Sequence, residues 1–403
     1  MKHSDSFPIH LPLGFTFSAG VAGIKASGRA DVALAEASPG TTAAAVFTKN
    51  RVVAAPVTLG REFLAKTRGQ VRALVVNAGN ANCATGPAGI RHARRVCSEV
   101  ARRLKVRTET VLPSSTGIIG VPLPVDKLLR KLPELIATRA STESAVVQVA
   151  KAIMTTDTKA KLASAYFRTK SGKVNLLGIA KGSGMIHPQL ATMLVFLFSD
   201  IAAEPGELRR LLRSAAEGTF NCISVDGDTS TNDTVLLLAS GRSDISLANS
   251  GVRGRFTRAL AAVCWSLSEQ IIGDGEGVHH RVGLRIEQAR TRKEAIEIAQ
   301  AIARSLLVKT AWAGADPNWG RILAAIGAAK PSVDPRQIDI LIGDQLVCRR
   351  GMHHRFDRRR AHAEMRKPTY EIRVKLGRGR ARARFLTTDL SAEYVRLNAE
   401  YST

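Results

Sequence analysis

The sequence lacks the long apolar run that a membrane-spanning helix requires. Its longest uninterrupted apolar stretch, at residues 259–265, has seven residues, whereas a span needs roughly 20. The apolar part of the N-terminal segment is broken by Pro8, His10 and Pro12, so we expect no secretory signal peptide. These two absences argue against a membrane protein and against a secreted one.

The sequence also lacks paired metal-binding or disulfide-forming residues. Its five cysteines are odd in number, widely scattered and without a CxxC pair, which argues against a disulfide scaffold or a zinc site. The adjacent histidine pairs at residues 279–280 and 353–354 do not have the i, i+4 spacing of a helical metal site. We therefore predict that no metal is bound and that the protein works in the reducing cytoplasm.

Acidic residues are scarce: 34 Asp and Glu stand against 59 Lys and Arg, giving a formal net charge of +25. Such an excess can attract nucleic acid or other anionic partners. In residues 89–107, however, apolar side chains at helical spacing leave most of the arginines on the opposite, solvated face. The densest basic run, residues 348–367, contains one aromatic residue, Phe356, so stacking platforms for single strands are not evident. Nucleic-acid binding is kept only as a minor alternative.

What the sequence does contain is an alternation of short β-like runs and amphipathic helices along 403 residues, 45% of them hydrophobic. This pattern predicts an α/β or α+β protein with two lobes. One helix is predicted from Pro205 to Gly218, which are favoured first and last residues. Another is predicted after a capping box formed by Thr291 and Glu294. Residues 370–390 alternate polar and apolar side chains, which predicts two strands with one charged face.

Several polar loops follow the predicted strands. Residues 77–86 hold three asparagines and two glycines, so a structural turn and a functional loop are equally open. Ser114, Ser115, Thr116 and Gly117 could direct a hydroxyl and backbone N–H groups at a developing oxyanion. Residues 225–233 lack the glycine and glutamate of a calcium loop and are predicted to form an Asx-rich turn. Glu276, in a glycine-flanked loop, could meet a cationic ligand or simply be solvated.

Thr192 lies at the start of an apolar, strand-like run, directly after Ala191. A β-branched residue suits a strand, so a structural role is one interpretation. An internal threonine has no adjacent base, whereas a threonine at a new N-terminus can use its own α-amino group as general base. The small Ala191 and the nearby Gly182 and Gly184 would permit the Thr192 hydroxyl to approach the Ala191 carbonyl. We hypothesise an N-to-O acyl shift and ester hydrolysis that cut the chain before Thr192.

Long motifs throughout the chain support this hypothesis. The sequence resembles the ornithine acetyltransferase family of arginine biosynthesis, also called glutamate N-acetyltransferase, over nearly its whole length. The motifs that carry the resemblance are VFTKNRVVAAPV, NAGNANCATG, SSTGIIGVPLP, IMTTDT, GIAKGSGMIHPQLATML, TFNCISVDGDTSTNDT, DGEG, DPNWGRILAAIG and NAEYST. The resemblance implies a layered α/β sandwich related to the N-terminal-nucleophile architecture. It also implies self-cleavage at Ala191–Thr192 into an α chain, residues 1–191, and a β chain, residues 192–403, assembled as an α2β2 heterotetramer.

The same resemblance implies roles for individual residues. Thr192 would be the acetyl-accepting nucleophile, and Thr116 and Gly117 would form the oxyanion hole. The substrate-binding positions that it implies are Thr155, Lys181, Thr192, Glu276, Asn398 and Thr403. The cation of Lys181 suits a substrate carboxylate, and the anion of Glu276 suits an ammonium. The implied reaction is ping-pong: N-acetylornithine acetylates the nucleophile and releases ornithine, and glutamate then takes the acetyl group, with no cofactor.

The sequence departs from the family pattern beside Glu276. Gly273 stands where an arginine often occurs, and His279 and His280 replace a common Thr-Lys pair, which leaves the substrate preference open. Three rival hypotheses remain. The enzyme could also use acetyl-CoA to acetylate glutamate; it could be a self-cleaving aminopeptidase or amidase; or it could be a basic nucleic-acid-binding protein in which Thr192 only fills a strand.

Overall fold

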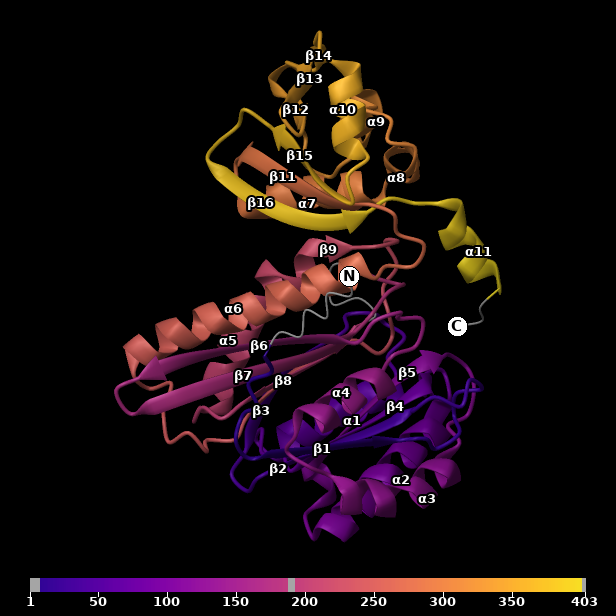
Figure 1. Ribbon diagram of the computed structural model, residues 1–403, viewed down its shortest axis with the longest axis vertical. Coiled ribbons are helices and arrows are strands. Elements are labelled where there is room, and N and C mark those ends of the chain that lie inside the picture. Colours follow the sequence, from indigo (N-terminus) through magenta and orange to yellow (C-terminus); the bar gives the residue numbers. More distant parts are fainter. Residues whose placement is uncertain (1–7, 188–192, 401–403) are drawn as a thin grey trace.

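The computed structural model of the protein describes residues 8–187 and 193–400. Its N-terminal part contains a mixed four-stranded sheet in the order β1-β2-β4-β5, in which β4 and β5 run parallel (Figure 1). These strands are β1 (Phe15–Gly20), β2 (Val32–Ala37), β4 (Ala73–Asn80) and β5 (Val111–Ile118). The helices packed on this sheet are α1 (Ala55–Lys66), α2 (Gly86–Leu104), α3 (Val125–Thr138) and α4 (Glu143–Ala152).

A central five-stranded sheet, in the order β3-β10-β8-β7-β6, lies next to the first sheet. Its strands are β3 (Thr42–Phe47), β6 (Lys161–Thr169), β7 (Gly172–Lys181), β8 (Leu194–Ser199) and β10 (Thr234–Ala239). One face packs against the N-terminal layer, where the Phe198 ring lies 5.2 Å from that of Phe15. The other face is covered by α5 (Pro205–Gly218) and α6 (Ser250–Gly273). Because both faces are buried, β8 is apolar at nearly every position.

A seven-stranded sheet forms the C-terminal module, in the order β14-β13-β12-β15-β11-β16-β9, and has its own hydrophobic core. Its strands are β9 (Ile223–Ser224), β11 (Arg281–Ala289), β12 (Asp339–Ile342), β13 (Gln345–Arg349), β14 (Met352–His353), β15 (Thr369–Lys375) and β16 (Ala381–Thr388). Its helices are α7 (Arg292–Arg304), α8 (Leu306–Ala313), α9 (Trp319–Gly327) and α10 (Arg358–Met365). The last helix, α11 (Ala392–Glu400), leaves this module and extends toward the N-terminal sheet (Figure 1).

The layered α/β class predicted from the sequence is confirmed, as are several of its elements. Helix α5 spans the predicted Pro205–Gly218, and the Thr291 hydroxyl caps α7 by accepting from the Glu294 N–H at 3.1 Å. Residues 370–390 do form two strands, β15 and β16, but the two do not pair. Strand β11 lies between them, parallel to β15 and antiparallel to β16.

The predicted cleavage position divides the central sheet. Strands β3, β6 and β7 precede residue 191, whereas β8 and β10 follow residue 192. All six residues of β8 pair with β7 on one side and with β10 on the other. The two halves of the chain are therefore interwoven within one sheet.

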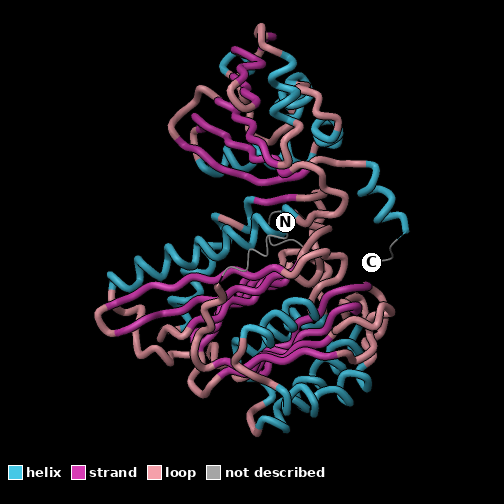
Figure 2. The backbone as a smooth tube through the Cα atoms, in the orientation of Figure 1, coloured by secondary structure: helices cyan, strands magenta, loops and turns pink. Residues whose placement is uncertain are grey.

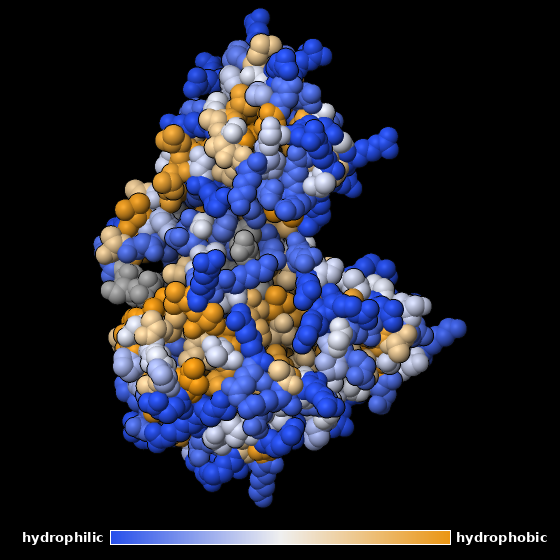
Figure 3. All heavy atoms as spheres, turned by 180° about the vertical axis from the view of Figure 1, so that it is seen from behind, coloured by the Kyte–Doolittle hydropathy of each residue, from blue (hydrophilic) through white to orange (hydrophobic). Residues whose placement is uncertain are grey.

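Hydrophilic side chains cover much of the rear surface, and a notch on one side separates the C-terminal module from the rest of the molecule (Figure 3). Among the described helices, none combines the length and the hydropathy of a membrane span.

Candidate active site

Loops that connect elements of the three sheets come together near the middle of the molecule (Figure 2). Residues of these loops line a polar cavity of about 220 Å³. Its walls come from β5, the end of β7, the loops after α4, β9 and α6, and helix α11. Six predicted site residues line it together: Thr116, Gly117, Thr155, Lys181, Glu276 and Asn398. Gly273, His279 and His280, where the sequence departs from the family pattern, are not among the lining residues.

The predicted oxyanion-hole residues lie at the end of β5. The Thr116 side chain is buried, and its Oγ1 lies 3.3 Å from the Lys181 Nζ. An ammonium can only donate, so Thr116 accepts this bond and its own hydroxyl hydrogen is free for another acceptor. Gly117 has a φ of 130°, and a Cβ there would overlap the backbone of Gly79 and Asn80 in the neighbouring strand β4. This close approach requires glycine.

Lys181, the last residue of β7, is buried at the centre of the site. Its Nζ donates to the Thr155 hydroxyl at 2.8 Å and lies 3.9 Å from the carboxylate of Asp157. Burial lowers the pKa of the Lys181 ammonium, while the charge of Asp157 opposes that shift. The structure thus places a desolvated cation next to both Thr116 and Thr155.

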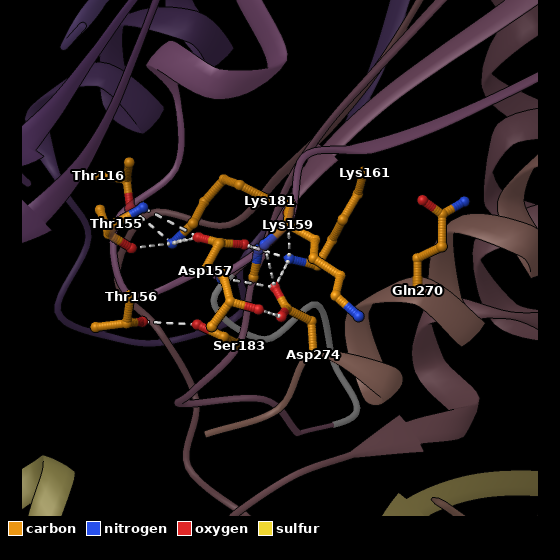
Figure 4. A network of polar contacts seen from close by, with 12 residues as sticks. Thr116, Thr155, Thr156, Asp157, Lys159, Lys161, Lys181, Ser183, Gln270 and Asp274 are labelled. Atoms are coloured by element: carbon orange, nitrogen blue, oxygen red, sulfur yellow. Dashed lines mark hydrogen bonds and ion pairs between the residues drawn. The ribbon is translucent and has the colours of Figure 1, made fainter. Parts of the chain in front are cut away.

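Asp157 holds this arrangement in place (Figure 4). Its carboxylate accepts from the backbone N–H of Thr155 at 3.0 Å and from that of Gly182 at 2.7 Å. It also pairs with the buried Lys161 at 2.6 Å. Burial alone would raise the pKa of Asp157, but the charges of Lys181 and Lys161 lower it to about 2. Asp157 is therefore an anion.

The Lys161 Nζ also lies 2.5 Å from a second buried carboxylate, that of Asp274, and so links it to Asp157. Asp274 in turn accepts from the backbone N–H of Thr158 at 3.0 Å. Two anions and two cations, the latter being Lys161 and Lys181, thus alternate beneath the cavity (Figure 4). Charges removed from water need such pairing.

The half-buried Glu276 also lines the cavity. Its carboxylate accepts from the Asn398 side chain at 2.9 Å, and its backbone N–H donates to the Ser183 carbonyl at 3.0 Å. A Cβ at Gly184 would overlap the Glu276 carboxylate, so a side chain there would displace this carboxylate from its position. One cavity therefore presents both the carboxylate of Glu276 and the amino group of Lys181.

Three predicted site residues, Ala191, Thr192 and Thr403, lie outside the described residues. Met193, directly after Thr192, is described and buried; its N–H donates to Asp233 Oδ1 at 3.0 Å. Burial raises the pKa of this Asp233 carboxyl well above its ordinary value. The strand that begins here, β8, pairs Leu194 with Lys181.

The asparagine-rich loop at residues 77–86 has a structural role. Asn77 donates to the Asn80 carbonyl at 2.8 Å and accepts from the Ser115 hydroxyl at 2.6 Å. Asn82 donates to the Gly89 carbonyl at 3.0 Å. These buried amides fix the turn that follows β4, next to the predicted oxyanion hole.

Asp226 is a cavity residue whose position the sequence did not reveal, because its segment was interpreted only as a turn. Its carboxylate accepts from the Met185 N–H, from the Ile186 N–H at 2.9 Å and from the Tyr394 hydroxyl at 3.3 Å. Burial raises the pKa of Asp226 to about 6. It joins the loop after β7 to helix α11. The alternation of acidic residues in this segment is the feature of the sequence that could have indicated a place in the cavity.

Comparisons with known proteins identify the family of this chain. The ArgJ family model matches residues 16–403. The chain is 44% identical over 394 residues to the arginine biosynthesis bifunctional protein ArgJ of Methylococcus capsulatus, covering 97% of this chain and 95% of that protein. It is 42% identical over 393 residues to the protein of the same name from Geobacter sulfurreducens, covering 97% of this chain and 99% of the relative.

A crystal structure of the arginine biosynthesis bifunctional protein ArgJ from Bacillus halodurans shares 36% identity and has a TM-score of 0.49, covering 52% of this chain and 98% of that chain. The sequence relatives carry the assignment by themselves, since they extend over nearly the whole length of both proteins. The protein belongs to the ArgJ family.

Proposed function

We propose that the protein transfers the acetyl group of N-acetylornithine to glutamate in arginine biosynthesis, through an acetyl ester on Thr192. The observation that carries this proposal is the cavity that brings Thr116, Gly117, Lys181 and Glu276 together. Membership of the ArgJ family, whose relatives are named as arginine biosynthesis proteins, supports it.

The charges of the cavity suit an amino-acid substrate. An α-carboxylate would be attracted to the Lys181 side, where the hydroxyl of Thr155 is a further hydrogen-bonding group. The side-chain ammonium of N-acetylornithine would meet Glu276, whose carboxylate Asn398 orients. Charge-assisted hydrogen bonds at both ends fix the acetyl group relative to the protein.

The chemistry requires two acyl transfers. After cleavage at Ala191–Thr192, the free α-amino group of Thr192 takes the hydroxyl proton while Oγ1 attacks the acetyl carbonyl. The Thr116 hydroxyl and the Gly117 N–H would stabilise the resulting oxyanion. The C–N bond then breaks, the α-amine returns the proton, and ornithine leaves. The amine of glutamate next attacks the ester, giving N-acetylglutamate and the free threonine hydroxyl.

A second donor, acetyl-CoA, is supported by the word "bifunctional" in the names of the relatives. Thr192 Oγ1 would attack the thioester carbonyl, the C–S bond would break, and the thiol would leave with the proton. The later step with glutamate is the same. We infer that one acetyl-threonine serves both donors, without a bound cofactor.

We further infer that the two cleavage products, residues 1–191 and residues 192–403, stay together and assemble as an α2β2 heterotetramer. The interwoven central sheet supports the first part of this inference. Five buried, unpaired thiols are in keeping with a cytoplasmic enzyme.

The test of the proposed function is ornithine release from N-acetylornithine, measured with and without glutamate. We expect sustained release only with glutamate, matched mole for mole by N-acetylglutamate. Sustained release without glutamate would instead identify a hydrolase, because water would then intercept the acyl-enzyme. Repeating the assay with acetyl-CoA as donor tests the second activity.

A further inference from the structure

A second groove, of about 460 Å³, lies outside the candidate active site, between helices α1 and α5. Its floor is apolar and includes Ala45 and Phe47 of β3 and Leu64 of α1. Strand β3 is the edge strand of the central sheet. Pro205 also lines the groove. It packs so closely on Gly69 that a Cβ at this glycine would lie 2.8 Å from the Pro205 side chain.

Four arginines line this groove, and no carboxylate does. Arg61 lies on α1 and Arg68 just beyond the C-terminal end of that helix, with a left-handed φ of 52°, whereas Arg209 and Arg213 lie one turn apart on α5. Arg209 and Arg213 therefore share one face of α5. Within the described ranges, the side chains of Arg68, Arg209 and Arg213 have no ion pair or hydrogen bond, and all three are exposed. Guanidinium groups arranged in this way suit phosphate or carboxylate groups.

One end of the groove lies close to the start of β8. Phe47 pairs with Thr234, and Thr234 pairs with Leu194, two residues after Thr192. Two strand spacings separate Phe47 from Leu194 by about 10 Å. The buried Thr48 lies between the two sites: its carbonyl accepts from Arg61 at 2.7 Å, and its hydroxyl donates at 2.7 Å to the carbonyl of the cavity residue Ser230.

We propose that this groove, the α1–α5 groove, binds the phosphate-bearing nucleotide end of an acyl-CoA. The inference rests on the proposed function, in the form in which acetyl-CoA is a donor. The arginines would bind the phosphates, and the apolar floor with Phe47, over which Arg61 lies at 5.6 Å, would receive the base. The pantetheine arm would carry the acyl group from the groove toward the start of β8.

The experiment measures binding of coenzyme A to the purified full-length protein by calorimetry. The test variant is Arg209→Ala/Arg213→Ala, and Arg210→Ala is its matched control, since Arg210 is an exposed neighbour on α5 that does not line the groove. We expect the double variant to bind coenzyme A at least about tenfold more weakly, because two charge-assisted contacts are lost. The control should bind as the wild type does.

Steady-state kinetics of the same proteins separate this inference from the proposed function. The double variant should need a higher acetyl-CoA concentration but keep the wild-type rate of transfer from N-acetylornithine, which also shows that it is folded. Wild-type protein that does not bind coenzyme A, or a double variant that binds it undiminished, overturns the inference. So does an equal loss in Arg210→Ala, or a groove that binds an acidic peptide in place of coenzyme A. Absence of N-acetylornithine transfer in the wild type would overturn the proposed function alone.

Discussion

At the scale of single residues, the contact between Lys181 and Thr116 decides how the oxyanion hole could work. Lys181 donates to Thr116 Oγ1, so the threonine hydrogen points elsewhere. We predict that Thr116→Ala slows acetyl transfer about 10²–10³-fold, the usual cost of losing one oxyanion donor. Thr116→Ser keeps the hydroxyl and should recover much of the rate. Turnover in Thr116→Ala equal to that of the wild type would remove Thr116 from the mechanism.

Glu276 is the residue that we expect to pair with the positive charge of the substrate. We predict that Glu276→Gln raises the KM for N-acetylornithine more than tenfold, because a partly desolvated ion pair is lost. Glu217→Gln, at an exposed glutamate of α5, is the matched control and should be neutral. If both substitutions leave KM unchanged, Glu276 is only a solvated or structural carboxylate.

At the scale of elements, the pairing of β4 and β5 depends on a close backbone approach at Gly117. An alanine there would overlap strand β4, whereas Gly120, also at positive φ, has no atom near its missing Cβ. We predict that Gly120→Ala costs about 1–2 kcal/mol of stability, from its left-handed backbone alone. Gly117→Ala should cost clearly more and abolish transfer. Thermal unfolding of the two variants checks this, and equal melting temperatures would contradict it.

The elements themselves were largely predictable from local sequence. Pro205, Gly218 and the Thr291–Glu294 capping box mark helix ends through local hydrogen bonding and fixed backbone angles. The position of β11 between β15 and β16 was not predictable, because strand order depends on contacts distant in sequence. Alternation of polar and apolar residues indicates which side chains share a face of a strand, but not which strands lie beside it.

The candidate site shows the same limit. Motif resemblance supplied Thr116, Lys181 and Glu276, and the family assignment it suggested is confirmed. The buried network of Lys161 and Asp274 was not foreseen, since a lysine in an alternating strand normally faces solvent. Asp274, with which Lys161 pairs, is 113 residues away in the sequence, and the periodicity of a sequence does not indicate such a contact.

At the scale of the whole molecule, His187 couples folding to pH. Burial, with a smaller effect from the charge of Arg304, lowers the pKa of His187 to about 4. Between pH 6.5 and 4 the unfolded chain therefore binds a proton at His187 that the folded protein does not, and stability falls as the pH falls. We predict a loss of about 2 kcal/mol between pH 7 and pH 5 from this group.

The measurement is the melting temperature of the wild type and of His187→Gln across this pH range. The wild type should lose stability more steeply than the variant, which cannot take up the proton. Parallel curves would show that His187 titrates in the same way in both states.

The shared central sheet makes a second prediction for the whole molecule. Since β8 from one half pairs with β7 from the other, the two cleavage products should not separate under native conditions. Gel filtration should give one species that contains both fragments. Their separation without denaturant would contradict the interwoven arrangement.

The central claim is that Thr192 becomes an N-terminal nucleophile, and intact-mass measurement on denatured, active protein tests it most directly. We predict two fragments, residues 1–191 and residues 192–403, with Thr192 as the first residue of the second. Thr192→Ala should leave one chain without transfer activity, because the hydroxyl both cuts the chain and carries the acetyl group. Thr192→Ser should still cleave and retain some activity. Active wild-type protein that consists only of the full-length, 403-residue chain would contradict the account.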